Sequence, residues 1–453
     1  MFHKVLIANR GEIAVRIIRA CKQLGIETVA IYSEADRDSL HVQIADESVC
    51  VGGVRSNESY LNMENIITAA VNKGAEAIHP GFGFLSENSS FSDLCAECGI
   101  TFIGPSGEVI DKMGNKARAR EIMIEANVPV VPGSDGAVDS LDDAREKAVG
   151  IGFPILIKAS AGGGGRGMRV ASDLSEFDVA YETARSEALN GFGDDTMYLE
   201  KFVLNPKHIE FQILADKYGN VVHLGERDCS IQRRNQKVIE EAPSLISDDL
   251  RSRMGEAAIK AAKTVNYENA GTLEFLVSDG EFYFIEMNTR IQVEHPITEM
   301  VTGVDIIKEQ IKIAAGEKLS FTQDDVVLKG HAIECRINAE DPKFDFRPSP
   351  GTIELLHVPS GHGVRFDSFI YAGYSIPPYY DSMMGKIIVH GENREDAIKK
   401  MKATLDELLI TGVKTNQDFC NMILNNLDYV KGNFDTGYIA KKIDQLLEYD
   451  EFE

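Results

Sequence analysis

The segment from Glu274 to His295 concentrates ionisable and amide side chains in a strand–turn–strand pattern followed by a polar loop. In the second strand, FYFIEMN, residues two apart share a face, so Glu286 and Asn288 are expected to lie together near the strand end. Two oxygen donors with this spacing suit a hard cation such as Mg²⁺. The pattern favours a metal site, because a solvated acidic face fits poorly beside so many aromatic residues.

The length of the turn around Ser278, Asp279 and Gly280 decides whether Glu274, on the first strand, can join this set. A two-residue turn at Asp279-Gly280 would put Glu274 and Glu286 on opposite faces of the hairpin. A three-residue turn with a left-handed Gly280 would put them on the same face. Because a shared metal site needs the second arrangement, we predict an odd-length turn.

The loop after this hairpin, TRIQVEHP, places two opposite charges close to the expected metal. Arg290 is suited to bind a small anion, and Glu294 is suited to act as a base beside it. Two more basic segments stand out in an acidic chain: RRNQK, which ends at Lys237, and the strand that contains Arg336. Taken alone, each of these segments is more simply explained as solvated charges on the surface. They indicate a binding site only if the fold brings them to one cleft.

A glycine-rich segment, KASAGGGGRGMRV from Lys158 to Val170, has five glycines among residues 162–167. So many glycines indicate a backbone that a phosphate approaches closely. The segment matches the dinucleotide pattern G-x-G-x-x-G, but that pattern needs a helix after the glycines. Here β-forming residues stand on both sides, so we predict a hairpin flap, with Lys158 and Arg166 directed at the phosphates. A flexible hairpin without a ligand is the alternative.

The first hundred residues alternate strand and helix, which predicts a parallel, doubly wound sheet. The turn Asn9-Arg10-Gly11, with Glu34 and Asp36 beyond the second strand, imitates a nicotinamide site. Only one glycine stands where three are expected, so a dehydrogenase is disfavoured. From Gly107 to Val128 the sequence predicts a single helix.

The composition limits the possible partners. With 47 Lys and Arg against 71 Asp and Glu, the net charge is −24, which argues against nucleic acid. No apolar run approaches the roughly 20 residues of a membrane helix. The seven cysteines are an odd number without a framework spacing, which favours a reduced, cytoplasmic protein.

Six motifs, in chain order, resemble those of biotin carboxylase, within the biotin-dependent carboxylases: KVLIANRGEIAVRIIRA, HPGFGFLSEN, KASAGGGGRGMRV, ERDCSIQRRNQKVIEEAPS, FYFIEMNTRIQVEHPITE and ECRINAEDP. The resemblance extends to about residue 445 and implies an α/β (α+β) chain with the ATP-grasp fold. Its expected parts are a Rossmann-like, doubly wound domain (1–114), an ATP-grasp domain (115–329) with an inserted mobile lid (about 133–203), and a C-terminal mixed α/β domain (330–446).

The resemblance also implies roles at matching positions. Those expected to hold ATP are Lys116, Lys158, Gly164, Gly165, Glu200, Lys201, Phe202, Val203, His208 and Gln232. Those expected to hold Mg²⁺ or Mn²⁺ are Glu274, Glu286 and Asn288. Those expected to hold bicarbonate are Lys237, Arg290, Gln292, Val293 and Glu294, with Glu294 as the base. Arg336 would stabilise the biotin enolate, and Phe82 would lie on the biotin side.

The implied reaction is the ATP- and bicarbonate-dependent carboxylation of biotin through carboxyphosphate. The string Lys400-Met401-Lys402 lacks the second methionine of a biotin-bearing motif, so biotin is expected on a separate carrier protein. The expected setting is an acetyl-CoA carboxylase of fatty acid synthesis, with carboxyltransferase partners, a homodimer and no membrane contact.

Two positions depart from the pattern of the family: Phe82 stands where tyrosine is common, and Asn235 stands where histidine is common. Neither touches the expected metal, base or anion site, so tuning rather than loss of activity is expected. Two other function classes stay open: an ATP-grasp ligase that activates a different acid, and a nucleotide-binding regulator that does not turn ATP over.

Overall fold

The computed structural model describes residues 1–134, 136–159 and 167–448. The chain divides into two compact units. The first comprises Met1–Val128, Lys207–Phe275 and Glu286–Glu453, and the second comprises Pro129–Pro206 and Leu276–Ile285. Among the described residues, no helix is long and apolar enough to cross a membrane.

The first unit opens with a five-stranded parallel sheet, in the strand order β3-β2-β1-β4-β5. Its strands are β1 (Lys4–Ile7), β2 (Glu27–Ser33), β3 (Glu47–Gly52), β4 (Ala77–His79) and β5 (Thr101–Phe102). The helices between them are α1 (Gly11–Gln23), α2 (Leu40–Ile44), α3 (Met63–Lys73) and α4 (Ser89–Glu97). The predicted doubly wound sheet is confirmed. The sequence analysis missed β3, an edge strand that is mostly half-exposed and so lacks a continuous apolar run.

The turn Asn9-Arg10-Gly11, which resembles a nicotinamide site in sequence, makes structural contacts instead. Asn9 donates its amide to the carbonyls of Pro80 (2.7 Å) and Phe82 (2.8 Å). Arg10 forms a buried ion pair with Asp36 at 2.6 Å, and Asp36 is fully buried. An acidic residue that is already paired with a guanidinium is unsuited to bind a ribose, so the dehydrogenase alternative fails.

The helix predicted from Gly107 to Val128 is two helices, α5 (Gly107–Gly114) and α6 (Lys116–Glu125). Asn115 separates them with an extended backbone, and its side chain accepts a hydrogen bond from the N–H of Arg118. An asparagine that caps a new helix in this way competes with continuation of the previous one.

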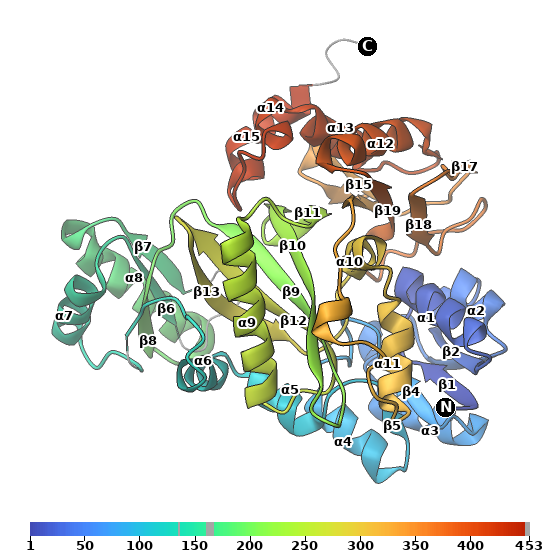
Figure 1. The fold of residues 1–453 in the computed structure, drawn as a ribbon. Coiled ribbons are helices and arrows are strands. Elements are labelled where there is room, and N and C mark those ends of the chain that lie inside the picture. The colour runs from blue at the N-terminus through green and yellow to red at the C-terminus, as the bar shows by residue number, and fades with distance from the viewer. Residues whose placement is uncertain (135, 160–166, 449–453) are drawn as a thin grey trace. The chain divides into compact units, whose positions relative to one another are not determined.

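The larger sheet has the order β13-β12-β9-β10-β11-β14-β19-β18, and its strands from β9 to β18 in this order pair antiparallel. Its strands are β9 (Lys207–Ala215), β10 (Val221–Arg233), β11 (Gln236–Ala242), β12 (Asn269–Ser278), β13 (Glu281–Asn288), β14 (His331–Asn338), β18 (Val364–Ser368) and β19 (Met383–Gly391). In Figure 1, α9 (Asp248–Thr264) lies along β9 and β10, and it contacts both strands. Two short helices, α10 (His295–Thr302) and α11 (Ile306–Ala314), follow β13.

The C-terminal part of the first unit covers the end of this sheet. α12 (Arg394–Glu407) packs on β14 and β19, with Ala397, Met401 and Leu405 buried. The segment around Met401 is therefore an ordinary amphipathic helix. It is followed by α13 (Gln417–Asn425), α14 (Leu427–Val430) and α15 (Tyr438–Leu447). Four very short strands, β15 (Glu340–Asp341), β16 (Arg347–Pro348), β17 (Leu356–His357) and β20 (Leu409–Ile410), form two small ladders.

The second unit contains a three-stranded antiparallel sheet, in the order β7-β6-β8, built from β6 (Ile155–Ala159), β7 (Met168–Ala171) and β8 (Met197–Lys201). Two helices, α7 (Leu141–Ile151) and α8 (Leu174–Phe192), complete it. Asp173 caps α8, and its side chain accepts from the N–H groups of Ser175 and Glu176. The glycine segment therefore joins two antiparallel strands, as predicted. The flap residues themselves, including Gly164, Gly165 and Arg166, lie outside the described residues.

The turn between β12 and β13 corrects the prediction of an odd-length turn. β12 ends at Ser278 and β13 begins at Glu281, and both turn residues have positive φ, 52° at Asp279 and 78° at Gly280. This is a two-residue turn of the kind that matches the twist of a hairpin. Burial along β13 alternates only as far as Phe284 and then resumes at Met287, so the period of two breaks beside Glu286. Asn288 reaches Glu274 although the turn has two residues, so strict alternation does not hold along the whole of β13.

Candidate active site

Lys237 on β11 is the centre of a buried cluster of charges in the first unit. Its ammonium lies 2.6 Å from Oε2 of Glu210, 3.1 Å from Oε1 of Glu274 and 2.6 Å from Oε1 of Glu294. Burial alone would lower the pKa of Lys237, but the surrounding acidic groups outweigh it and raise that pKa well above its usual value. Lys237 is therefore a fixed positive charge.

Glu294, at the start of α10, is fully buried and sits between two cations. Its Oε1 accepts from Lys237, and its Oε2 accepts from Nη2 of Arg336 at 2.9 Å. Burial would raise the pKa of Glu294, but Lys237, Arg336 and the nearby Arg227 hold it well below its usual value. The carboxylate is thus ionised and able to accept a proton. An anion that binds the same two cations would make it a stronger base.

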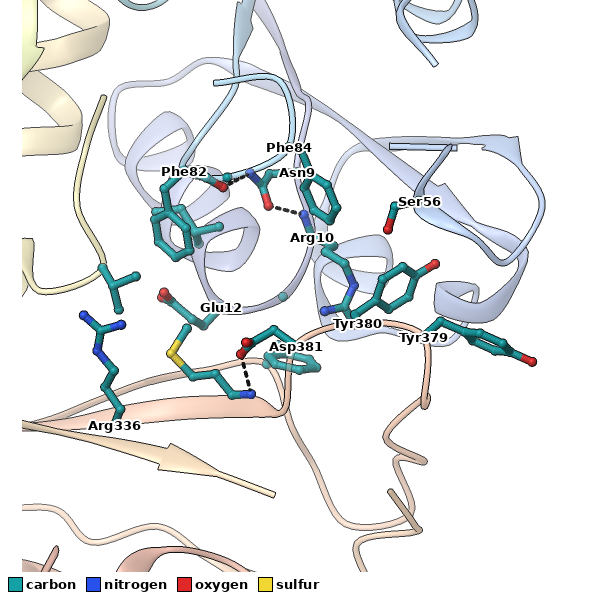
Figure 2. A pocket seen from close by; sticks show the side chains of 16 residues that line it. Asn9, Arg10, Glu12, Ser56, Phe82, Phe84, Arg336, Tyr379, Tyr380 and Asp381 are labelled. Carbon is teal, nitrogen blue, oxygen red and sulfur yellow. Dashed lines mark hydrogen bonds between the residues drawn. The ribbon is translucent and has the colours of Figure 1, made fainter. Parts of the chain in front are cut away.

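Arg336 on β14 connects this cluster to a cavity of about 500 Å³ in the first unit. Its Nε donates to Oε1 of Glu240 at 2.6 Å. Figure 2 shows its guanidinium directed into the space that Phe82 and Glu12 also line, with Ser56 and Tyr379 farther along the cavity. Val293 lines the same cavity. The volume falls within the range of small-molecule sites, about 300–1,000 Å³.

Arg290, near the end of β13, donates to the carbonyl of Ile291 (3.2 Å) and to three side-chain oxygens. Its Nε donates to Glu87 Oε2 (2.7 Å), Nη1 to Gln292 Oε1 (2.9 Å) and Nη2 to Asn288 Oδ1 (3.1 Å). Gln292 in turn donates to Oε1 of Glu274 at 3.2 Å. The predicted clamp therefore reaches Glu294 through Gln292, Glu274 and Lys237 rather than by direct contact.

The three predicted metal-binding residues supply only oxygen atoms, as a hard divalent cation requires. Asn288 donates its amide to Oε1 of Glu274 at 2.9 Å, so these two side chains meet as predicted. Glu286 is about one-third exposed (35%) and pairs with Lys116 at 3.1 Å, an ion pair that an incoming cation can displace. This donor set fits Mg²⁺. The buried group His208, Glu210 and Glu274 also has ligand atoms within 4.8 Å of one another. The Lys237 ammonium bonds to both of these glutamates, and so also to Glu274 of the predicted metal set.

Two other predicted ATP residues of the first unit, His208 and Gln232, lie beside the same cluster. His208 places Nε2 3.1 Å from Oε2 of Glu274, and this carboxylate raises the pKa of His208 despite the opposing effect of burial. Gln232 on β10 is the register partner of Lys237 on β11. Lys116 is exposed at the start of α6.

The remaining predicted ATP residues belong to the second unit. Lys158 on β6 forms an ion pair with Glu200 on β8. Lys201 donates its ammonium to the carbonyls of Gly152 (2.8 Å) and Phe153 (2.6 Å), so its side chain is a structural tie. The N–H groups of Lys201 and Phe202 bond to the carbonyls of Pro132 and Pro154. An adenine edge would therefore meet other main-chain atoms of this segment, such as those of Val203.

The residues of the basic segment RRNQK lie in two different environments: the two arginines pair with Asp345, and Lys237 pairs with Glu294. Arg234 and Asn235 form a two-residue turn with positive φ, 49° and 63°, between β10 and β11. Asparagine suits this backbone, which explains locally why it is tolerated where the family pattern has histidine. Arg233 and Arg234 both pair with Asp345, on the surface. Lys237 and Arg336 alone converge, on Glu294.

The sequence analysis missed several charged residues that organise the site: Glu87, Glu210, Arg227, Glu240, Glu334 and Lys386. Arg227 is fully buried and donates to Glu210 (2.6 Å), Gln212 (2.8 Å) and Thr298 (2.9 Å). Most of these residues could have been noticed in the sequence, because each is a charged residue inside an apolar strand, as in HIEFQILA or HAIECRIN. Such residues are rarely buried without a partner.

Comparison with known proteins shows the family of the chain. Three family models cover the chain: the N-terminal domain of biotin carboxylase (residues 1–110), the ATP binding domain of the carbamoyl-phosphate synthase L chain (115–322) and the C-terminal domain of biotin carboxylase (334–441). A biotin carboxylase of Nostoc sp. is 58% identical over 442 residues, 97% of this chain and 99% of that protein. A pyruvate carboxylase component from Methanothermobacter thermautotrophicus is 54% identical over 97% of this chain and 90% of that protein.

A solved structure agrees with these relatives. The biotin carboxylase domain dimer of Hydrogenobacter thermophilus 2-oxoglutarate carboxylase, in complex with MgADP, ADP and bicarbonate, has a TM-score of 0.91 and 54% identity. The match covers 98% of this chain and 99% of that one. The predicted ATP-grasp fold is thus confirmed. The chain belongs to the biotin carboxylase family, and it is an ATP-dependent carboxylase of the ligase class.

Proposed function

We propose that this chain carboxylates biotin on a separate carrier protein, using ATP and bicarbonate and passing through carboxyphosphate. The observation that carries the proposal is the position of Glu294. Its carboxylate bonds on one side to Lys237, in the cluster of metal-binding oxygens, and on the other to Arg336, which lines the 500 Å³ cavity. One base therefore lies between a site for a small anion and a site for a larger ligand.

In the first step, Arg290, Lys237 and Gln292 bind bicarbonate, with the main chain at Val293. The anion competes with Glu294 for the charge of Lys237, which raises the pKa of Glu294 and lets it accept the bicarbonate proton. The deprotonated oxygen is the better nucleophile toward the γ-phosphate of ATP. Lys116, Lys158, His208, Gln232 and the flap glycines hold the nucleotide.

The oxygen set of Glu274, Glu286 and Asn288 holds the divalent cation, Mg²⁺ or Mn²⁺, which when bound spreads the charge of the phosphates. The Hydrogenobacter domain contains MgADP and bicarbonate, which supports both ligands here. Asn288 also accepts from Arg290, so the metal set and the anion set share a side chain.

In the second step, biotin enters the cavity beside Arg336 and Phe82. Carboxyphosphate releases CO₂ and phosphate, the phosphate takes the proton of the ureido nitrogen, and this nitrogen attacks CO₂. Arg336 stabilises the negative charge that develops on the ureido oxygen when the proton leaves. Among the residues that line the cavity are aromatic rings, including Phe84, Phe369 and Tyr380, which suit the apolar body of biotin.

The wider setting that we propose is an acetyl-CoA carboxylase of fatty acid synthesis in the cytoplasm, with a biotin carboxyl carrier protein, carboxyltransferase subunits and a homodimeric form of this chain. The relatives named biotin carboxylase and the dimer of the Hydrogenobacter domain support it. Other relatives belong to pyruvate or 2-oxoglutarate carboxylases. Transfer from the carboxylated carrier to acetyl-CoA, pyruvate or 2-oxoglutarate, in the presence of the organism's own transferase, distinguishes the three acceptors.

The test of the reaction is ATP hydrolysis with and without bicarbonate and free biotin, in the wild type and in Glu294→Ala. We expect turnover that needs bicarbonate, rises with biotin and falls by about 100-fold or more in the variant. Turnover without bicarbonate would indicate a ligase for a different acid. ATP binding without any turnover would indicate a regulator.

A further inference from the structure

The Arg336 guanidinium is held at two of its three nitrogens by buried carboxylates. Nε donates to Glu240 at 2.6 Å, and Nη2 donates to Glu294 at 2.9 Å. Glu294 is the proposed base, so its charge disappears during each turnover. Glu240 has no such role, and it approaches Arg336 from the neighbouring strand β11.

Glu240 is fully buried, and its second oxygen has no hydrogen-bond partner among the described residues. It lies opposite Glu334 in the ladder between β11 and β14, and Glu334 is also fully buried with neither oxygen hydrogen-bonded within the described part of the chain. Opposite residues in an antiparallel ladder point to the same face. The two carboxyls therefore lie on the same face of the sheet, and the charge of Glu240 disfavours ionisation of Glu334.

Charged and titratable groups face Glu240 from each neighbouring element. They are Cys229 on β10, Glu334 and Arg336 on β14, Glu294 at the start of α10 and Lys237 on its own strand. Lys386 on β19 faces Glu334, and it pairs with Glu12 of α1 at 3.1 Å. Burial and the nearby Glu294 raise the pKa of Glu240, against the effect of Arg336, to about 7. Burial and the nearby Glu240 raise the pKa of Glu334 well above its usual value, against the effect of Lys386.

From this geometry we infer that Glu240 is a positioning residue for the biotin half-reaction: its carboxylate keeps the Arg336 guanidinium directed into the cavity while Glu294 gains and loses a proton. The inference rests on the proposed function.

Glu294 alone could not hold the Arg336 guanidinium in one position through the reaction. When Glu294 accepts a proton, its bond to Arg336 changes from an ion pair to a weaker bond with a neutral acid. Without a second anchor, the guanidinium would be free to turn at the moment when charge develops on biotin. When Glu294 is ionised, a guanidinium paired with it alone would be drawn away from the cavity. An ionised Glu240 opposes both movements because it fixes Nε.

The experiment compares Glu240→Gln with Glu241→Gln. Glu241 is the next residue on β11, is equally buried and faces the other way, where it pairs with His331 (2.8 Å) and Arg394 (2.6 Å). Two rates are measured in each protein: biotin-independent, bicarbonate-dependent ATP hydrolysis and carboxylation of free biotin. We expect Glu240→Gln to lower the ratio of the second rate to the first by about tenfold, the loss for a charged hydrogen bond. Glu241→Gln should keep the wild-type ratio.

The pH dependence separates anchoring from a general effect on the fold. At about pH 6, wild-type Glu240 is largely protonated and resembles glutamine, so the defect of Glu240→Gln should be small. At about pH 8.5 it is ionised, so the defect should be largest. A defect of equal size at both values, or equal ratios in the two variants, would overturn the inference.

A second variant covers the case in which Glu240→Gln does not fold. Glu240→Asp keeps the buried charge but withdraws it by one methylene, which breaks the 2.6 Å bond to Nε. We expect the same selective loss of biotin carboxylation, and a wild-type ratio would overturn the anchoring role. Absence of any biotin-dependent rate in the wild type would instead refute the proposed function itself, so the two failures are distinguishable.

Discussion

The ammonium of Lys237 lies 2.6 Å from Oε1 of Glu294, so the proposed anion-binding cation and the proposed base form a buried ion pair. Bicarbonate must compete with this pair to bind. The competition couples the two events, because the anion that occupies the cation also makes the carboxylate more basic. Such coupling keeps Glu294 ionised until the substrate arrives.

Replacement of Lys237 by methionine should abolish bicarbonate-dependent turnover and also destabilise the protein. Three buried carboxylates would lose their common cation, and breaking a buried pair from one side costs about 3–5 kcal/mol. Urea unfolding measures the stability, and ATP hydrolysis measures the turnover. Lys207→Met, which removes a part-buried ion pair with Asp228 (3.0 Å), is the matched control and should keep bicarbonate dependence.

Arg336→Ala should retain ATP binding and lose most biotin carboxylation, by about 100-fold. Arg336 contacts Glu240 and Glu294 and lines the cavity, whereas the predicted ATP residues lie around Glu274 and in the second unit. Nucleotide binding is measured by titration calorimetry, and carboxylation by a biotin-dependent assay. Arg233→Ala, whose partner is the surface residue Asp345, serves as the control. Loss of ATP affinity in Arg336→Ala would contradict the assignment of Arg336 to the biotin site.

Phe82→Tyr should lower the KM for free biotin by about threefold, the effect of one added hydrogen bond. The new hydroxyl would enter the cavity that Arg336 also lines. Steady-state kinetics with varied biotin measure the change, and the KM for ATP should not move. An increase in the biotin KM would show that the ring packs where a hydroxyl has no room.

Glu286→Gln should raise the Mg²⁺ concentration for half-maximal turnover by about tenfold with little change in melting temperature. The side chain is about one-third exposed and pairs with Lys116, so its loss leaves no buried charge unpaired. A chelator should stop turnover in the wild type, and added Mg²⁺ or Mn²⁺ should restore it. Asp249→Asn, on the surface of α9, should leave the metal requirement unchanged.

Glu241 should contribute to the acid sensitivity of the fold. Burial would raise its pKa, but His331 and Arg394 outweigh it and lower that pKa to about 2. A depressed pKa gives stability that is complete above about pH 4.5 and is lost as the pH falls toward 2, about 3 kcal/mol in all. The difference in urea midpoint between wild type and Glu241→Gln should therefore be large at about pH 6 and shrink below about pH 4. A difference that does not change with pH would contradict this assignment.

The sequence predicted the fold well where its signals are local. The doubly wound sheet and the two strands around the glycine segment follow from alternation and apolar runs. The contact between Glu274 and Asn288 forms although the turn length on which that prediction depended was wrong. The family motifs extended this to nearly the whole chain. The prediction of a single helix was wrong at Asn115. One side chain there caps a new helix, although the residues on both sides favour a continuous one.

The buried ionic network was not predictable in the same way. Glu240 and Glu241 are adjacent in the sequence and equally charged, and only the pairing of β11 with β14 decides that one bonds to Arg336 and the other to His331 and Arg394. The hairpin shows a related limit: the two-residue turn at Asp279-Gly280 did not prevent contact between Glu274 and Asn288, because burial along β13 does not alternate strictly.

The pairing of β11 with β14 also restricts how this protein can evolve. Insertion of one residue before Glu240 would exchange the faces of Glu240 and Glu241. The bond of Glu240 to Arg336 and the ion pairs of Glu241 would then be lost together. Insertion of two residues would restore the alternation but shift Lys237 away from its three carboxylates. A substitution in this strand alters the contacts of one side chain, whereas a change of length alters those of every side chain together.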